Sequence, residues 1–147
     1  KSGPSPRTAP FRRERRPSLE RTLAMPPGTG LSALLAGHVT SGVVRPLPGV
    51  RDLHVLCAGP PPPNPQELLL RPAFAALLHE LARRYAHVIV DTSAGVDGAD
   101  AALVAARAGA TVVVGRRGAS RLRRMRLLID RLGTAGARIA GVVMNER

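Results

Sequence analysis

The first candidate for chemistry is Asp91, which ends the apolar run His87–Val90 and is followed by Thr92. In open α/β sheets, a buried strand that ends in a carboxylate places a catalytic or metal-organising group at the carboxyl edge of the sheet. The alternative is an ordinary core strand whose last Asp begins a turn. Ser93 lacks a Gly-x-Ser-x-Gly pattern around it, so a hydrolase of that type is not expected. The pattern after Asp91 favours the first interpretation.

The chain after Asp91 alternates between helical and strand-like patterns. Asp97 and Asp100 suit a helix N-terminus, where short acids accept unpaired amide protons. The last apolar run ends at Asn145. Short connections between such elements predict two right-handed crossovers and a parallel sheet. The expected elements here are a helix over 99–107, a strand over 111–114, a helix over 120–132 and a strand over 139–144.

The residues before Asp91 extend the same pattern. A run near 53–57 is a predicted strand, and the proline-rich stretch 59–65 is an extended loop, interpreted as a stiff connector with a docking surface as the alternative. Apolar side chains with helical spacing predict a helix near 73–85. The prediction is therefore an α/β fold whose central parallel sheet has helices packed on it. Its expected strands lie near 53–57, 88–91, 111–114 and 139–144.

The segment Met25–Ser32 contains Pro-Pro-Gly-Thr-Gly, which precedes lysine in many ATPases. A phosphate-binding loop requires a buried strand before it and a lysine that reaches the terminal phosphates. Leu31 stands where that lysine would be, and the residues before Met25 do not form a strand pattern. The segment is therefore predicted to be a plain turn before a short helix from Leu31 to Ala36.

Composition limits the remaining classes of function. A chain of 147 residues with 44% hydrophobic residues can bury one core, and no apolar run has the length of a membrane span. The single cysteine excludes an intramolecular disulfide and fits a reducing cytoplasm. No histidine has a partner at metal-ligand spacing, so a zinc site is not expected. The net charge of +12 permits nucleic-acid binding, but the arginines are scattered and aromatic residues are scarce. Nucleic acid is therefore not the expected partner.

Residues 1–14 form the first segment, which is rich in proline, serine and arginine. Such a composition cannot bury enough apolar surface to order itself, so this segment is expected to be a mobile basic tail. Residues 15–147 are then expected to form one α/β domain.

The order of the motifs resembles the bacterial tyrosine autokinases of exopolysaccharide export, over roughly Arg15 to Arg147. It is most similar to the kinases associated with chain-length determinants, whose signature resembles 99–101 and 116–121 of this chain. The other motifs that carry the resemblance are Arg15–Leu19, Gly30–Gly37, Leu56–Gly59, Pro62–Leu69, Val88–Thr92 and Gly141–Asn145.

The resemblance implies a P-loop-NTPase-like parallel sheet with helices on both faces, which binds ATP and Mg²⁺ at its carboxyl edge. Asp91 matches the Walker B carboxylate, which would hold the magnesium through a water and serve the catalytic step. Thr92 follows it at the same edge as a cofactor-binding residue. Asn145 matches the Asn that lies by the adenine in related ATPases. Asp100 matches an acidic position of the family. Its main expected role is to cap a helix, and a role in catalysis is the second expectation.

The chain departs from the family at its N-terminal side. The first strand and the Walker A loop with its lysine are expected before residue 1. Neither is found in the sequence of 147 residues. The family's Asp-x-Asp motif is replaced by Phe11, Arg12 and Arg13. No tyrosine cluster is expected to follow Arg147. Phosphoryl transfer depends on positioning and on neutralising the phosphates, so a chain without these groups is expected to be catalytically impaired and to bind ATP weakly.

The resemblance therefore implies a cytoplasmic, ATP-dependent protein tyrosine kinase that regulates exopolysaccharide chain length, with enzymatic activity left open for this chain. Its expected partner is the cytoplasmic part of a membrane chain-length-determinant protein, a polysaccharide co-polymerase. That partner would hold it at the inner membrane, and a homo-oligomer is left open. One alternative is a non-enzymatic interaction module of the same fold. A weaker alternative is a relative of the partition-type ATPases that binds DNA.

Overall fold

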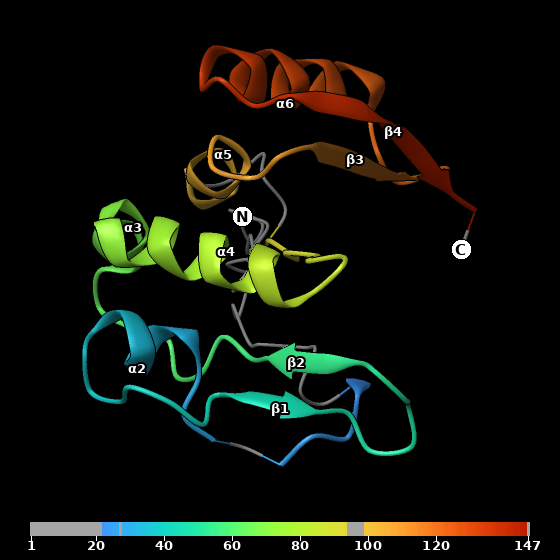
Figure 1. Cartoon of the computed structure of the whole chain (residues 1–147). Helices are drawn as coiled ribbons and strands as arrows, with labels where there is room; N and C mark the ends of the chain where they lie inside the picture. The colour runs from blue at the N-terminus through green and yellow to red at the C-terminus, as the bar shows by residue number, and fades with distance from the viewer. Residues whose placement is uncertain (1–21, 27, 94–98, 147) are drawn as a thin grey trace, which may run out of the picture.

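The computed structural model describes residues 22–26, 28–93 and 99–146 of the chain (Figure 1). The expected tail, residues 1–14, lies outside the described residues. The elements in chain order are α2 (Leu31–Leu35), β1 (Val44–Pro46), β2 (His54–Leu56), α3 (Pro65–Leu70), α4 (Pro72–Arg84), α5 (Asp100–Ala105), β3 (Thr111–Arg116), α6 (Leu122–Thr134) and β4 (Ile139–Asn145).

Strands β1 and β2 form an antiparallel hairpin, in which Val44 lies opposite Leu56. The backbone N–H of Leu47 donates to the carbonyl oxygen of Leu53 at 2.8 Å and closes the connection between them. Gly49 has a φ of 78° within this connection, a left-handed conformation that glycine adopts at no steric cost. The short connection explains the pairing, because strands close in sequence meet with little loss of chain entropy.

Strands β3 and β4 form a second, parallel pair, and α6 is the crossover that joins them. The helix covers one face of the pair, where Val113 and Leu132 are 4% and 3% exposed. It ends in a Schellman motif: the N–H of Ala137 donates to the carbonyl of Leu132, and that of Gly136 to the carbonyl of Gly133. Gly136 has a φ of 84°, which this motif requires.

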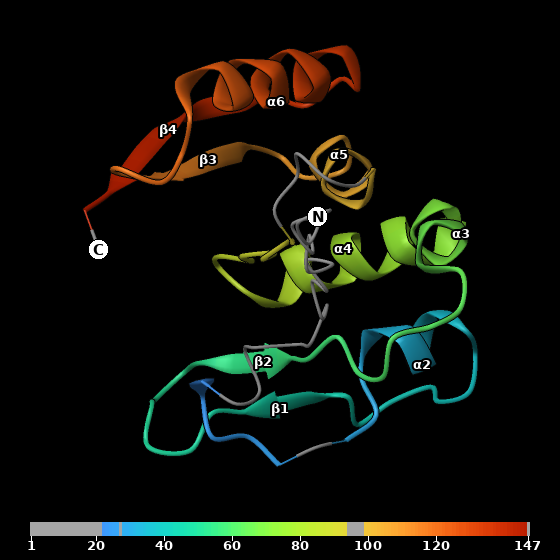
Figure 2. The same ribbon diagram turned by 180° about the vertical axis from the view of Figure 1, so that it is seen from behind.

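Helices α3, α4 and α5 lie between the two sheets in both views (Figures 1 and 2). Their shared core contains Leu35 of α2, Leu68 of α3, Phe74 of α4 and Val104 of α5. Phe74 is the most buried of the four, at 1% exposure. Because each of the four helices contributes a side chain to this cluster, it joins the hairpin side of the molecule to the β3–β4 side.

The predicted helices are confirmed within a few residues: 73–85 corresponds to α4, 99–107 to α5 and 120–132 to α6. The apolar stripe of α4 is also confirmed, since Phe74 is buried and the other stripe residues are partly buried, namely Leu77, Leu78, Leu81 and Tyr85. Phe74 and Leu78 of this stripe pack on side chains of other helices, and the ring of Tyr85 lies near that of His54 in β2, with centroids 5.4 Å apart. The short helix predicted from Leu31 to Ala36 is present as α2.

The prediction of one central parallel sheet was wrong in two respects. The predicted strand near 53–57 is β2, which pairs antiparallel with β1 and not with β3 or β4. The predicted strand 88–91 is not a strand. Its β-branched residues favour an extended backbone, but a strand also needs a neighbour, and no described residues pair with this run. The parallel pairing of the predicted strands 111–114 and 139–144 is confirmed.

Candidate functional site

Asp91 and Thr92 lie in the exposed segment that follows α4. Within the part of the chain that the structure describes, no hydrogen bond or ion pair joins either residue to Asn145. The apolar residues before them are exposed as well: Val88 by 38%, Ile89 by 93% and Val90 by 37%. Asp91 is thus available to a ligand from solvent, but its surroundings do not fix its position.

Asn145 is the last residue of β4, opposite Arg116 of β3. Its carbonyl oxygen accepts a hydrogen bond from the backbone N–H of Arg117 at 2.8 Å, and the side chain of Arg117 pairs with Glu146 at 3.2 Å. Ser120 ties down the loop after β3, because its hydroxyl oxygen accepts the N–H of Arg116 at 2.8 Å. The carboxyl end of the β3–β4 pair therefore carries an ordered, basic loop.

Asp100 is the first residue of α5 and is half-buried. Its carboxylate lies in the first turn, where a negative charge is favourable at the positive end of the helix dipole. The N-cap position itself is occupied by Ala99, so Asp100 contributes its charge from the first turn of the helix. Asp97, the other expected capping acid, lies outside the described residues.

The segment around Gly30 has a structural role. The N–H groups of Leu31 and Ser32 donate to the carbonyls of Cys57 and Ala58 at 2.8 and 3.0 Å, which docks the start of α2 onto the chain after β2. Gly30 is buried against this backbone and leaves no room for a Cβ. These amides are committed to protein carbonyls, so the prediction that this segment is a turn and not a phosphate-binding loop is supported.

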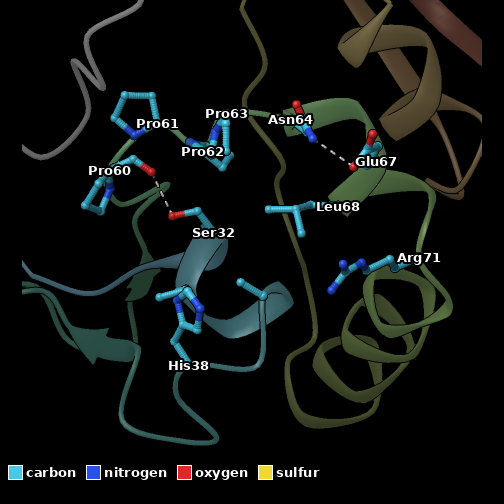
Figure 3. A pocket seen from close by; sticks show the side chains of 12 residues that line it. Ser32, His38, Pro60, Pro61, Pro62, Pro63, Asn64, Glu67, Leu68 and Arg71 are labelled. Carbon is cyan, nitrogen blue, oxygen red and sulfur yellow. Dashed lines mark hydrogen bonds between the residues drawn. The ribbon is translucent and has the colours of Figure 1, made fainter.

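A pocket of about 390 Å³ lies between α2, the proline-rich loop and α3 (Figure 3). Its walls are mainly apolar. On one side the Ser32 hydroxyl donates to the carbonyl of Pro60 at 2.9 Å, and on the other the Asn64 amide donates to the Glu67 carboxylate at 3.0 Å. The side chain of Arg71 donates to the carbonyl of Leu35 at 3.3 Å. The remaining lining residues are Ala33, Ala36, His38, Pro61, Pro62, Pro63 and Leu68.

The proline-rich loop is therefore both a connector and the wall of a pocket, which sequence reasoning did not predict. Prolines at 60–63 were a visible signal of a stiff wall, but the opposite wall comes from α2, about thirty residues earlier. The ordered basic loop after β3 was not predicted either, although residues 116–121 are part of the family resemblance.

Metal binding depends on Asp91 alone among the expected residues. Within the described residues there is no group of three or more His, Cys, Asp and Glu side chains that could hold a metal ion. Magnesium is commonly held by one or two carboxylates together with water and substrate phosphates. Asp91 fits that mode only if a nucleotide supplies the phosphates.

No helix in the described part of the chain is long and apolar enough to cross a membrane.

Comparison with known proteins identifies relatives of the chain. No family model matches it. It is 36% identical over 116 residues to the tyrosine-protein kinase etk of Escherichia coli K12, and 31% identical over 117 residues to the tyrosine-protein kinase wzc of Salmonella typhimurium. These matches cover 79% and 80% of the chain but only 16% of each relative.

Solved structures extend the likeness to the fold. The kinase domain of the E. coli tyrosine kinase ETK matches with a TM-score of 0.84 and 33% identity, over 89% of this chain and 51% of that domain. The chimerical protein CapA2B2 matches with a TM-score of 0.83 and 32% identity, over 90% of this chain and 59% of that protein. The α/β, P-loop-kinase-like fold class is confirmed. The chain spans about half the length of these structures.

Proposed function

Because the chain is a relative of the bacterial tyrosine kinases, we propose that it represents part of an ATP-dependent protein tyrosine kinase that regulates exopolysaccharide chain length and export. The observation that supports this most is the combined likeness to the ETK kinase domain, 33% identity with a TM-score of 0.84. At that identity the likeness extends beyond a shared fold.

In this proposal ATP and Mg²⁺ bind beside Asp91, which is the catalytic and metal-organising residue. The carboxylate holds the magnesium through a water, and the phosphates of the nucleotide supply further ligands. Thr92 contributes to the same site, and Asn145 lies by the adenine. The exposure of Asp91 is compatible with such a ligand, since nothing in the described residues neutralises or covers it.

These residues alone bind ATP weakly in this proposal. Phosphates are normally held by loop amides and a lysine, and the glycine-rich segment at Gly30 has its amides committed to Cys57 and Ala58. Arg116 and Arg117 carry positive charge but are exposed, so salt screens their attraction for phosphate. The chain as it stands is therefore impaired in phosphoryl transfer.

Titration calorimetry with ATP and magnesium tests this site on the 147-residue chain. We expect no binding tighter than the millimolar range and no transfer of phosphate to a tyrosine-containing polymer. Asp91→Asn should abolish any residual magnesium-dependent heat, whereas Asp130→Asn on the exposed face of α6 should leave it unchanged. A low micromolar dissociation constant that Asp91→Asn abolishes would contradict the impairment, and binding that is indifferent to Asp91 would contradict the site.

The partner in this proposal is the cytoplasmic part of a membrane chain-length-determinant protein, which would hold the kinase at the inner membrane. The alternative is a non-enzymatic interaction module of the same fold, which the exposed apolar residues Val88–Val90 favour. A coding sequence that supplies a Gly-rich loop ending in Lys-Ser or Lys-Thr upstream of Lys1 would support the enzyme. Its absence would support the interaction module.

A further inference from the structure

Helix α6 lies at one end of the molecule, with β3 and β4 between it and α5 in both views (Figures 1 and 2). One face of the helix is committed to the core cluster that contains Val113, through the side chains of Met125, Leu128, Ile129 and Leu132. Side chains three and four positions apart share a face of a helix, so the remaining positions form an outer face. Every residue of that outer face is exposed, namely Leu122, Arg123, Arg126, Leu127 and Asp130.

The outer face and the loop before it carry a dense positive charge. Residues 116–131 contain seven arginines and a single acid, Asp130, which gives a formal charge of +6, half of the chain's +12. All seven arginines are exposed, and Glu146 pairs with one of them. We call the outer face of α6 together with these arginines the basic face. Its arginines are Arg116, Arg117, Arg121, Arg123, Arg124, Arg126 and Arg131.

Two leucines are exposed among these arginines. Leu122 is 66% exposed and Leu127 is 45% exposed, and on the helix they lie on either side of Arg123 and Arg126. Burial of such apolar side chains away from water is favourable. The basic face therefore suits a partner that presents anionic groups beside an apolar phase. An anionic lipid surface has this composition, because its phosphate head groups lie directly above the acyl chains.

We propose that the basic face of α6 docks on an anionic lipid surface, with the helix lying parallel to the membrane. The guanidinium groups donate to lipid phosphates, and Leu122 and Leu127 reach the boundary between head groups and acyl chains. Because α6 is already folded against β3 and β4, the contact requires no ordering of the helix. This contact goes beyond attachment through a partner protein, and it requires neither that partner nor kinase activity.

Other occupants use only part of the basic face. The phosphates of duplex DNA attract arginines, but they offer no apolar phase for Leu122 and Leu127. An acidic protein segment would be held best by a groove, whereas the pocket between α2 and α3 lies away from α6 (Figures 1 and 3). A second copy of the chain carries the same +12 charge and is repelled.

Flotation of the 147-residue chain with lipid vesicles tests the proposal at physiological ionic strength. We expect vesicles that contain phosphatidylglycerol to bind it roughly tenfold or more tightly than vesicles of phosphatidylcholine alone. The far-ultraviolet circular dichroism should not change on binding, since α6 is folded beforehand. No nucleotide is present, so a failure to bind vesicles leaves the proposed ATP site untouched, and a failure of that site leaves this inference untouched.

Matched double substitutions of arginine locate the contact. Arg123→Gln with Arg126→Gln removes two charges from the basic face, and each should weaken vesicle binding about fivefold. Arg83→Gln with Arg84→Gln removes the same charge from exposed positions in the last turn of α4 and should leave vesicle binding nearly unchanged. All four side chains are exposed, so the variants should fold, which the midpoint of urea unfolding checks.

The leucines separate a lipid surface from other polyanions. Leu122→Gln with Leu127→Gln should weaken binding to phosphatidylglycerol vesicles and leave the binding of duplex DNA at low salt unchanged. Equal losses in the two arginine double variants would assign binding to the total charge and overturn the proposal. It would also be overturned by the absence of a preference for anionic vesicles, or by duplex DNA binding more tightly than vesicles with no effect of the leucines.

Discussion

Gly30 stands where a side chain has no room. An added Cβ would lie inside van der Waals distance of the Cys57 carbonyl oxygen and the Gly59 amide nitrogen, both of them backbone atoms that cannot turn aside. Gly141 in β4 has open space at the same position. Two glycines that look alike in the sequence therefore have different roles. The first permits close packing between α2 and the chain after β2, and the second leaves a side chain position empty.

The matched substitutions Gly30→Ala and Gly141→Ala test this difference. We expect Gly30→Ala to lower the free energy of unfolding by roughly 3 kcal/mol, because the backbone must shift. Gly141→Ala should leave it unchanged or raise it by about 0.5 kcal/mol, because alanine loses less conformational entropy in a strand. Urea denaturation followed by circular dichroism measures both values. Equal effects of the two substitutions would show that the close approach at Gly30 is not rigid.

Helix α6 is followed by a glycine that adopts a left-handed backbone conformation. Gly133 lies inside the last turn, and Gly136 has a φ of 84° and closes the Schellman motif. An added Cβ would meet nothing within 4 Å at either position. The difference between them is therefore conformational rather than steric. The helix positions Leu132 in the core and starts β4 in register with β3, which places Asn145 at the end of the pair.

At the scale of this element, Gly136→Ala and Gly133→Ala are expected to have opposite effects. Gly136→Ala should lower the free energy of unfolding by about 1 kcal/mol, because alanine is strained in the left-handed region. Gly133→Ala should raise it by up to about 1 kcal/mol, since alanine is the better helix former. The midpoint of urea unfolding reports both changes. Shifts in the same direction would contradict the assignment of Gly136 as the cap.

The whole molecule carries a high positive charge. Its net charge of +12 is contributed mainly by arginines on several elements, and the pair Arg117–Glu146 is exposed on both sides. The charge can attract any polyanion over a distance set by the ionic strength, about 8 Å at physiological salt. It does not form a site that could read a base sequence, which requires side chains held against base edges.

Duplex DNA is therefore expected to bind the chain only at low salt and without sequence preference. Fluorescence anisotropy with two unrelated duplexes should give similar affinities, which fall steeply as salt rises because bound counterions are released. At physiological salt the association should be weak. Tight binding that resists salt, or that differs strongly between the duplexes, would contradict this and favour the partition-type ATPase alternative.

The sequence by itself determined the local features of this protein. Helical periodicity located α4 and α6, because an amphipathic stripe depends on neighbours three and four residues apart, and the short acids Asp97 and Asp100 indicated the start of α5. The β-branched runs located β3 and β4, and the order of the motifs identified the tyrosine kinases as relatives. Leu31 in the place of a lysine was enough to exclude a phosphate loop at Gly30.

The tertiary structure decided which of these segments have neighbours. Val88–Val90 and Val112–Val114 have similar compositions, yet only the second run is a strand, because a strand forms when another chain segment accepts its hydrogen bonds. The pocket behind the prolines has the same origin, since α2 supplies its second wall. Both features depend on contacts between residues far apart in sequence, and local composition and spacing carry no information about such contacts.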